Sequence, residues 1–151
     1  DARREDKPEW VDDMFGPDQL DTQLPNADFV VLTIPHTPAT EGLFDSSKFA
    51  LMKNSAIFIN IGRGMTTKLD DLNTALRSGS IGGAGLDVYE IEPLPEDHPL
   101  WDAPNTILTP HTAAVGGTNL LERRYEIVLE NFRKFAAGEP LRNEVDKANW
   151  F

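Results

Sequence analysis

Short apolar runs that alternate with helix signals constrain this fold more than any other feature of the sequence. The runs at 27–34 (ADFVVLTI) and 55–61 (SAIFINI) are rich in Val, Ile and Phe. Two weaker runs of the same kind follow at 83–89 and 105–110. Short, continuous apolar runs are typical of strands in a parallel sheet that is covered on both faces. We therefore predict four strands that are buried on both sides.

The segments between these runs carry signals for helices. Asp45 is a candidate N-cap for the segment SSKFALMK. Thr67 and Asp70 have the spacing of a capping box, and Gly79 is a candidate stop for the same helix. A series of strand, helix and strand requires right-handed crossovers, which place the strands parallel. The predicted fold class is therefore α/β.

The last predicted helix, at about 118–137, has the clearest pattern. Its apolar side chains recur at intervals of four and three residues, and we interpret the resulting stripe as packed in a core. The stripe consists of Leu121, Tyr125, Val128, Phe132 and Phe135. Gly138 is the predicted end of the helix. The aromatic residues Trp150 and Phe151 close the chain, and we expect this tail to dock on another surface.

Composition excludes several classes of partner. The 151 residues include 14 Lys and Arg against 25 Asp and Glu, a net charge of -11 that disfavours binding to nucleic acid or to an anionic membrane. Cysteine is absent from the sequence, so we expect neither disulfides nor a metal site built on thiolates. No apolar run approaches the roughly 20 residues of a membrane span, and the charged start lacks a signal peptide. We expect a cytoplasmic protein.

Residues that directly follow the predicted strands are the candidates for a functional site, because ligands of parallel α/β sheets bind at the carboxyl ends of the strands. These positions hold Arg63, Asp87, Glu92 and His111. Arginine is a planar fork that binds a carboxylate through two hydrogen bonds, and histidine exchanges a proton near neutral pH. The set predicts a 2-oxo or 2-hydroxy acid bound by Arg63, with His111 and Glu92 moving the proton on its oxygen. The alternative for Arg63 is a solvated side chain in an ordinary glycine-rich turn.

Three motifs carry a family resemblance. NIGRG, then GAGLDVYEIEPLPEDHPLW, then NTILTPHTAA occur in an order and at a spacing that resemble the D-isomer-specific 2-hydroxyacid dehydrogenases, which include glyoxylate/hydroxypyruvate reductases and phosphoglycerate dehydrogenase. The similarity extends from about Phe15 to the end of the chain. It implies a Rossmann-like sheet in which residues 1–117 are the carboxyl-terminal part of a dinucleotide-binding domain. Residues 118–151 would then be a helix and tail that return to the substrate domain.

The resemblance also implies roles for individual residues. Arg63 would anchor the substrate carboxylate, His111 would be the acid/base and Glu92 its partner, while Asp87 would bind the nicotinamide amide. The other cofactor contacts that the resemblance implies, some shared with the catalytic set, are Ile34, Pro35, Ile61, Gly62, Arg63, His111, Ala113 and Ala114. The glycines of NIGRG would let the backbone pass close to the nicotinamide. We interpret Glu90, near Glu92, as a solvated side chain.

The sequence departs from the family pattern in two respects. The G-x-G-x-x-G fingerprint is absent, and GGAGLD leads into a strand and not into a helix. The segment MTTK at 65–68 differs from the usual hydrophobic-plus-acid pattern. Asp1 is a candidate remnant of the acid that binds the ribose of NAD, whereas Arg3 and Arg4 are able to bind the 2′-phosphate of NADP. The expected cofactor is therefore NAD or NADP. We expect the chain to be the carboxyl-terminal half of a homodimeric enzyme, with the activity belonging to the full chain.

Two functions fit these observations. The leading hypothesis is an oxidoreductase that transfers a hydride between NAD(P)H and a small 2-oxo acid such as glyoxylate or hydroxypyruvate. The alternative is a non-catalytic, dinucleotide-sensing interaction protein, similar to the corepressor branch of the same superfamily. The complete set of Arg63, Glu92 and His111 does not separate the two hypotheses, because a sensor can keep these residues.

Overall fold

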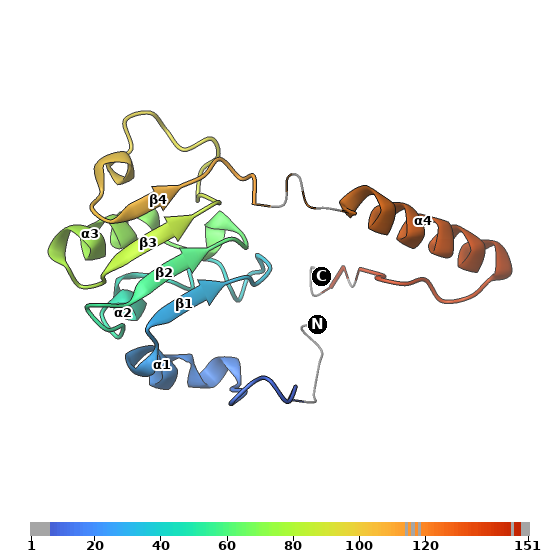
Figure 1. Cartoon of the computed structure of the whole chain (residues 1–151), viewed down its shortest axis with the longest axis horizontal. Helices are drawn as coiled ribbons and strands as arrows, with labels where there is room; N and C mark the ends of the chain where they lie inside the picture. Colours follow the sequence, from blue (N-terminus) through green and yellow to red (C-terminus); the bar gives the residue numbers. More distant parts are fainter. Residues whose placement is uncertain (1–6, 114, 116, 118, 146, 149–151) are drawn as a thin grey trace.

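The fold is built around one parallel sheet. The computed structural model describes residues 7–113, 115, 117, 119–145, 147 and 148. Four strands lie in the order β1-β2-β3-β4, and every neighbouring pair is parallel (Figure 1). Their bounds are Phe29–Leu32 for β1, Ile57–Asn60 for β2, Gly83–Leu86 for β3 and Thr106–Leu108 for β4. The predicted α/β fold with a parallel sheet is confirmed.

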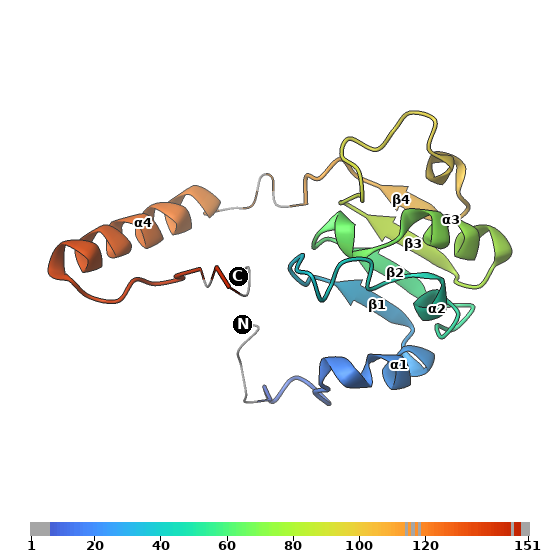
Figure 2. The ribbon, with the colours of Figure 1, turned by 180° about the vertical axis from the view of Figure 1, so that it is seen from behind.

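The connections between the strands contain short helices. The α-helices are α1 (Leu20–Gln23), α2 (Ser46–Phe49), α3 (Leu69–Ser78) and α4 (Leu120–Ala137). The 3-10 helices are η1 (Pro17–Gln19), η2 (Leu24–Asn26), η3 (Gly64–Thr66) and η4 (Pro99–Asp102). Helices α2 and α3 cover the same face of the sheet (Figure 2). Among the described residues, no helix is both long enough and apolar enough to cross a membrane.

The helix ends test the capping predictions. Asp45 caps α2 as predicted, because its Oδ1 accepts hydrogen bonds from the backbone N–H groups of Ser47 and Lys48. The capping box predicted for α3 is wrong. Thr67 has an extended backbone and precedes the N-cap residue, Lys68, which makes no capping bond through its own side chain. The predicted stop of α3 is confirmed, since Gly79 has a left-handed backbone with φ of 71°.

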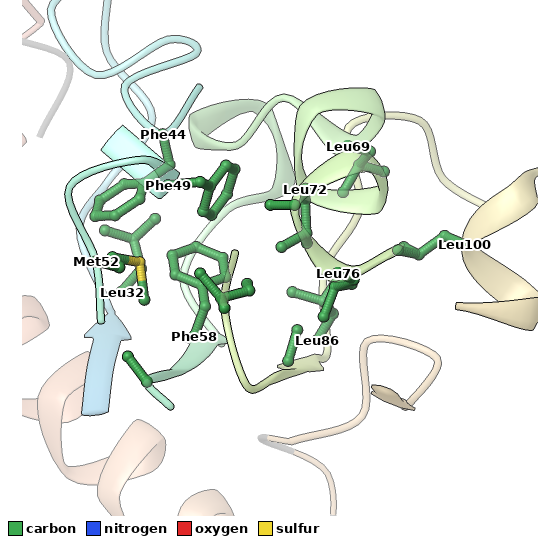
Figure 3. Packing of buried hydrophobic residues seen from close by; sticks show 14 of the residues in the cluster. Leu32, Phe44, Phe49, Met52, Phe58, Leu69, Leu72, Leu76, Leu86 and Leu100 are labelled. Atoms are coloured by element: carbon green, nitrogen blue, oxygen red, sulfur yellow. The ribbon is translucent and has the colours of Figure 1, made fainter. Parts of the chain in front are cut away.

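The core lies between the sheet and helices α2 and α3 (Figure 3). Its centre is a group of three phenylalanines, Phe44, Phe49 and Phe58, each no more than 1% exposed. The ring of Phe58 lies 4.9 Å from that of Phe44 and 5.3 Å from that of Phe49, measured between centroids. Leu72 and Leu76 of α3 complete the packing against this face. The strands are thereby held at a fixed distance from the helices that follow them.

The opposite face of the sheet contradicts the prediction that the strands are buried on both sides. Phe29 and Val31 of β1 are 68% and 53% exposed, and Ile107 of β4 is 72% exposed. The burial in β1 and β2 alternates, with Leu32 and Phe58 buried. The reason is that α2 and α3 both lie on the other face, so side chains that point away from these helices meet solvent (Figure 2).

Helix α4 lies away from the sheet (Figure 1). It ends at Gly138, as predicted, where the backbone is left-handed with φ of 70°. The interpretation of its apolar stripe as core is wrong for this chain, because no residue of α4 is buried. The exposed fractions of the stripe residues are 78% for Leu121, 67% for Tyr125, 67% for Val128, 70% for Phe132 and 76% for Phe135. The tail residues Trp150 and Phe151 lie outside the described residues.

Replacing Phe58 with alanine tests the description of the core. Because the ring of Phe58 is fully buried between two other rings, the Phe58→Ala variant should lose about 3–5 kcal/mol of unfolding free energy. The Phe29→Ala variant, in the neighbouring strand β1, is the control, and should lose only about 0.5 kcal/mol because the Phe29 side chain is exposed. Urea unfolding of the 151-residue chain, followed by circular dichroism, measures both values. Similar losses in the two variants would contradict this core.

Candidate active site

The four strands end at the same edge of the sheet, because all of them are parallel. Arg63 follows β2, and His111 follows β4. Asp87 and Glu92 both follow β3. The predicted set is therefore assembled at one edge, on three neighbouring loops.

Asn60, the last residue of β2, organises the loop that carries Arg63. Its side chain is fully buried. Its Nδ2 group lies within hydrogen-bond distance of the carbonyl oxygen of Arg63 (3.2 Å) and of Oγ1 of Thr67 (3.0 Å). Its Oδ1 atom accepts a hydrogen bond of 3.0 Å from the backbone N–H of Gly62. A buried amide with these partners holds the loop in one conformation, since breaking the bonds would leave buried polar groups unpaired.

The two glycines beside Arg63 are required by neighbouring backbone. A Cβ atom on Gly62 would lie 2.9 Å from the carbonyl oxygen of Ile34, the residue shortly after β1. A Cβ atom on Gly64 would overlap with the backbone of Tyr89. The two glycines thus permit a close approach between protein loops, and the expected approach of the backbone to the nicotinamide stays a prediction. The glycines bring the loops after β1, β2 and β3 into contact.

The side chain of Arg63 is exposed at this junction. Its Nη1 group donates a hydrogen bond of 2.7 Å to the carbonyl oxygen of Gly62. A guanidinium has five N–H donors, so the fork retains donors for a ligand. The arrangement is suited to a carboxylate, which accepts two parallel hydrogen bonds from arginine.

Asp87 joins the end of β3 to the loop that carries His111. Its side chain is buried, with 4% exposure. Its Oδ1 atom accepts hydrogen bonds from the hydroxyl of Thr109 (2.6 Å) and from the N–H of Thr112 (2.8 Å). Its Oδ2 atom accepts a hydrogen bond of 2.8 Å from the N–H of Ala113. Asp87 therefore binds the chain on both sides of His111.

This anchoring matters because His111 has a left-handed backbone, with φ of 52°. An L-residue pays roughly 1–2 kcal/mol for this conformation, so surrounding contacts must hold it. Burial raises the pKa of Asp87, but the hydrogen bonds from Thr109, Ala113 and Thr112 and the charge of His111 outweigh burial and lower the pKa overall. Asp87 is therefore ionised near neutral pH and holds the loop as a charged acceptor.

His111 and Glu92 form a direct pair. Nδ1 of His111 lies 2.7 Å from Oε2 of Glu92. The other oxygen of Glu92, Oε1, accepts a hydrogen bond of 2.9 Å from the N–H of Tyr89. An ionised carboxylate only accepts hydrogen bonds, so Nδ1 carries the proton and Nε2 is the nitrogen that exchanges a proton with a ligand. The side chain of His111 is 49% exposed, which leaves it accessible.

The surroundings of Glu92 keep it ionised. Burial raises the pKa of Glu92, but the hydrogen bonds from His111 and from the N–H of Tyr89 lower it, and so do the charges of His111 and Arg63, with a net lowering. Glu92 also lines an adjoining pocket of about 510 Å³, whose walls include Leu94 and Trp101. The effect of Arg63 on this pKa places its charge within electrostatic reach of the pair.

The residues expected to contact a cofactor lie along the same edge with different exposures. Pro35 and Ala113 are exposed, and Ile61 is 47% exposed. Ile34 is half-buried, and Gly62 is buried against it. Ala114 lies outside the described residues. Contact of these residues with a cofactor stays a prediction.

Sequence reasoning missed several residues that shape the site. Asn60 was included in an apolar strand without a role, although a single amide within such a run is a signal of a buried hydrogen-bond network. Tyr89 also went unnoticed, and its hydroxyl donates a hydrogen bond of 2.9 Å to the carbonyl oxygen of Thr109. The interpretation of Glu90 as solvated is wrong, because its side chain bonds to the start of α3.

Known proteins resemble this chain in sequence and structure. Residues 2–113 match the family described as D-isomer specific 2-hydroxyacid dehydrogenase, NAD binding domain. A glyoxylate/hydroxypyruvate reductase B of Citrobacter koseri is 50% identical over 108 residues, which cover 72% of this chain and 32% of the reductase.

Two solved structures are similar over most of this chain. A probable 2-hydroxyacid dehydrogenase of Rhizobium etli, in complex with NADP, HEPES and L(+)-tartaric acid, has a TM-score of 0.82 at 38% identity, covering 95% of this chain and 45% of that protein. An NADPH-dependent glyoxylate/hydroxypyruvate reductase of Sinorhizobium meliloti, in complex with NADP and sulfate, has a TM-score of 0.81 at 35% identity, covering 91% and 44%. The chain thus spans less than half the length of each of these proteins.

The role of Asp87 predicts a specific dependence of stability on pH. Since its pKa is lowered in the folded chain, its stabilising effect is complete above the ordinary carboxyl pKa of about 3.9 and is lost as the pH falls from there through the folded-state pKa. In the Asp87→Asn variant this part of the acid sensitivity should disappear, and the melting temperature should be lower near neutral pH. Melting temperatures of both chains between pH 3 and 6 measure the effect. Parallel curves for the two chains would contradict the role of the Asp87 charge.

Proposed function

This chain belongs to the D-isomer specific 2-hydroxyacid dehydrogenase family, through its NAD-binding domain, and we propose that it carries the carboxylate-binding and proton-transfer residues of an NAD(P)H-dependent reductase of small 2-oxo acids. The observation that carries the proposal is the 2.7 Å contact between His111 and Glu92, at the strand edge that also presents Arg63. Glyoxylate and hydroxypyruvate are the proposed substrates, because similar proteins are named glyoxylate/hydroxypyruvate reductases.

The strand edge fits the nicotinamide end of a cofactor. Ile61, which is 47% exposed, and the exposed Pro35 offer apolar contact surface beside the loops of Arg63 and His111. NADPH is the proposed first choice over NADH, since the reductase of Sinorhizobium meliloti is described as NADPH-dependent. Contact between Asp87 and the nicotinamide amide stays a prediction. In the structure, its two carboxylate oxygens already accept three hydrogen bonds from the His111 loop.

The side chains divide the chemistry of carbonyl reduction among them. Arg63 binds the carboxylate of the substrate through its fork and so sets the orientation of the neighbouring carbonyl group. His111 gives a proton from Nε2 to the carbonyl oxygen, and Glu92 holds the Nδ1–H group and stabilises the positive charge of the imidazole before the transfer. NAD(P)H, when bound, would supply the hydride that adds to the carbonyl carbon. The hydride and the proton together convert the 2-oxo acid into the 2-hydroxy acid.

The remaining proposals concern the complete enzyme, by which we mean residues 1–151 together with any sequence that adjoins them. Residues 1–117 form part of the dinucleotide-binding domain, and residues 118–151 pack against a substrate domain. The exposed apolar stripe of α4 supports this packing, because such a stripe needs a partner surface. A homodimer in the cytoplasm completes the proposal.

Replacing Arg63 with lysine tests the proposed function. Lysine keeps the positive charge but cannot form two parallel hydrogen bonds with a carboxylate. In the complete enzyme, the Arg63→Lys variant should lower kcat/KM for glyoxylate or hydroxypyruvate at least about tenfold, equivalent to about 1.4 kcal/mol of transition-state stabilisation. Oxidation of NADPH, followed by absorbance, measures the rate.

The matched control is the Arg77→Lys variant, because Arg77 is an exposed arginine of α3 that bonds to Asn73 and Pro99. Its kcat/KM should stay within about twofold of the parent. Unchanged kinetics in the Arg63→Lys variant would make Arg63 a solvated side chain. A parent enzyme that binds NADPH but turns over neither 2-oxo acid would favour the dinucleotide-sensing alternative.

A further inference from the structure

Glu90 lies two residues before Glu92 and bonds to a different part of the site. We propose that Glu90 is a positioning residue that ties the segment carrying Glu92 to the start of α3, and thereby fixes the His111–Glu92 pair relative to Arg63. The proposal rests on the proposed function, which supplies the reaction that this geometry serves. It adds a residue that touches neither substrate nor cofactor.

The start of α3 depends on Glu90. The N-cap residue of the helix is Lys68, whose side chain makes no capping bond. A cation at the positive end of a helix is unfavourable, and the first N–H groups of a helix need acceptors from elsewhere. Oε2 of Glu90 accepts a hydrogen bond of 3.1 Å from the N–H of Leu69, and Oε1 lies 3.1 Å from Nζ of Lys68. Both carboxylate oxygens of Glu90 are therefore engaged by α3.

The start of α3 is also the end of the Arg63 loop. Helix η3 follows Arg63 directly, and Thr67 and Lys68 lead from η3 into α3. The Asn60 side chain lies within hydrogen-bond distance of the Arg63 carbonyl and of Thr67. Because Glu90 bonds to the start of α3, it is also connected to the loop that carries Arg63.

The segment around Glu90 reaches the His111 loop on its other side. The hydroxyl of Tyr89 donates a hydrogen bond of 2.9 Å to the carbonyl oxygen of Thr109, two residues before His111. The N–H of Tyr89 donates to Oε1 of Glu92, which leaves Oε2 for His111. Residues 89–92 therefore bridge the two loops, and Glu90 attaches this bridge to the side of Arg63. The distance from the carboxylate anchor to the proton donor depends on that attachment.

The side chain of Glu90 is shielded enough for the contact to persist. It is 27% exposed, and Lys68 is 47% exposed. The hydrogen bond and the charge of Glu90 are the largest causes of a raised pKa of Lys68, with smaller contributions from Glu41 and Asp71. The ammonium therefore stays charged across the range in which a reductase is assayed.

A second substitution separates positioning from helix capping. In the Glu90→Ala variant, α3 loses its cap and the bridge loses its attachment. Adding Lys68→Asp places a carboxylate at the N-cap residue itself, whose extended backbone suits a side-chain cap. The double variant should restore the cap of α3 but not the attachment of residues 89–92.

The experiment compares the complete enzyme, the Glu90→Ala variant, the Glu90→Ala/Lys68→Asp variant and a Glu96→Ala control. Glu96 is an exposed glutamate on the same loop. The readouts are the melting temperature, kcat and KM for glyoxylate with NADPH, and hydrogen–deuterium exchange of the peptide that contains the Tyr89 amide. Glu90→Ala should lower the melting temperature, lower kcat about tenfold or more through misplacement of the pair, change KM less than about threefold, and speed exchange at Tyr89. The double variant should recover the melting temperature alone, and Glu96→Ala should match the parent.

Two results would overturn the proposal. The first is recovery of kcat and of slow exchange at the Tyr89 amide in the double variant, which would make Glu90 a helix cap without a positioning role. The second is a Glu90→Ala variant whose kcat and Tyr89 exchange match those of the parent, which would lead to the same conclusion. If the parent itself turns over no 2-oxo acid, the proposed function fails, while exchange at Tyr89 in the four proteins still decides whether Glu90 holds the bridge.

If Glu90→Ala does not fold, Glu90→Gln takes its place. It keeps an acceptor for the Leu69 N–H and loses the charge that holds Lys68, so faster exchange at Tyr89 is again the expected result and unchanged exchange the contrary one.

Discussion

The geometry of the site depends on the hydrogen bonds that the carboxylate of Asp87 accepts. It accepts three hydrogen bonds from the loop after β4, and that loop holds His111 in a left-handed backbone conformation. The same aspartate stands at the end of β3, at the start of the segment that leads to Glu92. Asp87 therefore connects the loop that carries His111 to the segment that carries Glu92. A buried charge is costly unless its partners are supplied in full, and here backbone N–H groups and a hydroxyl supply them.

The Arg63 side of the site is organised by a neutral group in place of a charge. Asn60 is fully buried and bonds to the loop at Gly62, Arg63, Thr66 and Thr67. Because Asn60 also belongs to β2, the loop is fixed directly to the sheet. The sheet in turn packs through the aromatic core against α2. The packed face thus supplies rigidity, while the strand ends supply the groups that bind and exchange protons.

Much of this arrangement was predictable from sequence, because it follows from local patterns. The short apolar runs predicted parallel strands, and parallel strands require that Arg63, Glu92 and His111 share one edge. Several of the misses concern partners that are distant in sequence. Glu90 caps a helix that begins 21 residues earlier, and no local spacing reveals such a contact. The stripe of α4 and the open face of the sheet were predicted as buried because an apolar pattern indicates that a surface needs a partner. The pattern does not indicate which part of the chain provides that partner.

In the proposed reaction, Arg63 and His111 bind the two ends of one 2-oxo acid. Oxamate, which has the shape of a 2-oxo acid but resists reduction, is the suitable probe for a crystal structure of the complete enzyme with NADPH. We expect that Arg63 contacts the oxamate carboxylate through two hydrogen bonds, and that Nε2 of His111 lies within hydrogen-bond distance, about 2.6–3.2 Å, of the neighbouring carbonyl oxygen. Oxamate bound away from both side chains, or with its carboxylate facing His111 and not Arg63, would contradict these roles of Arg63 and His111.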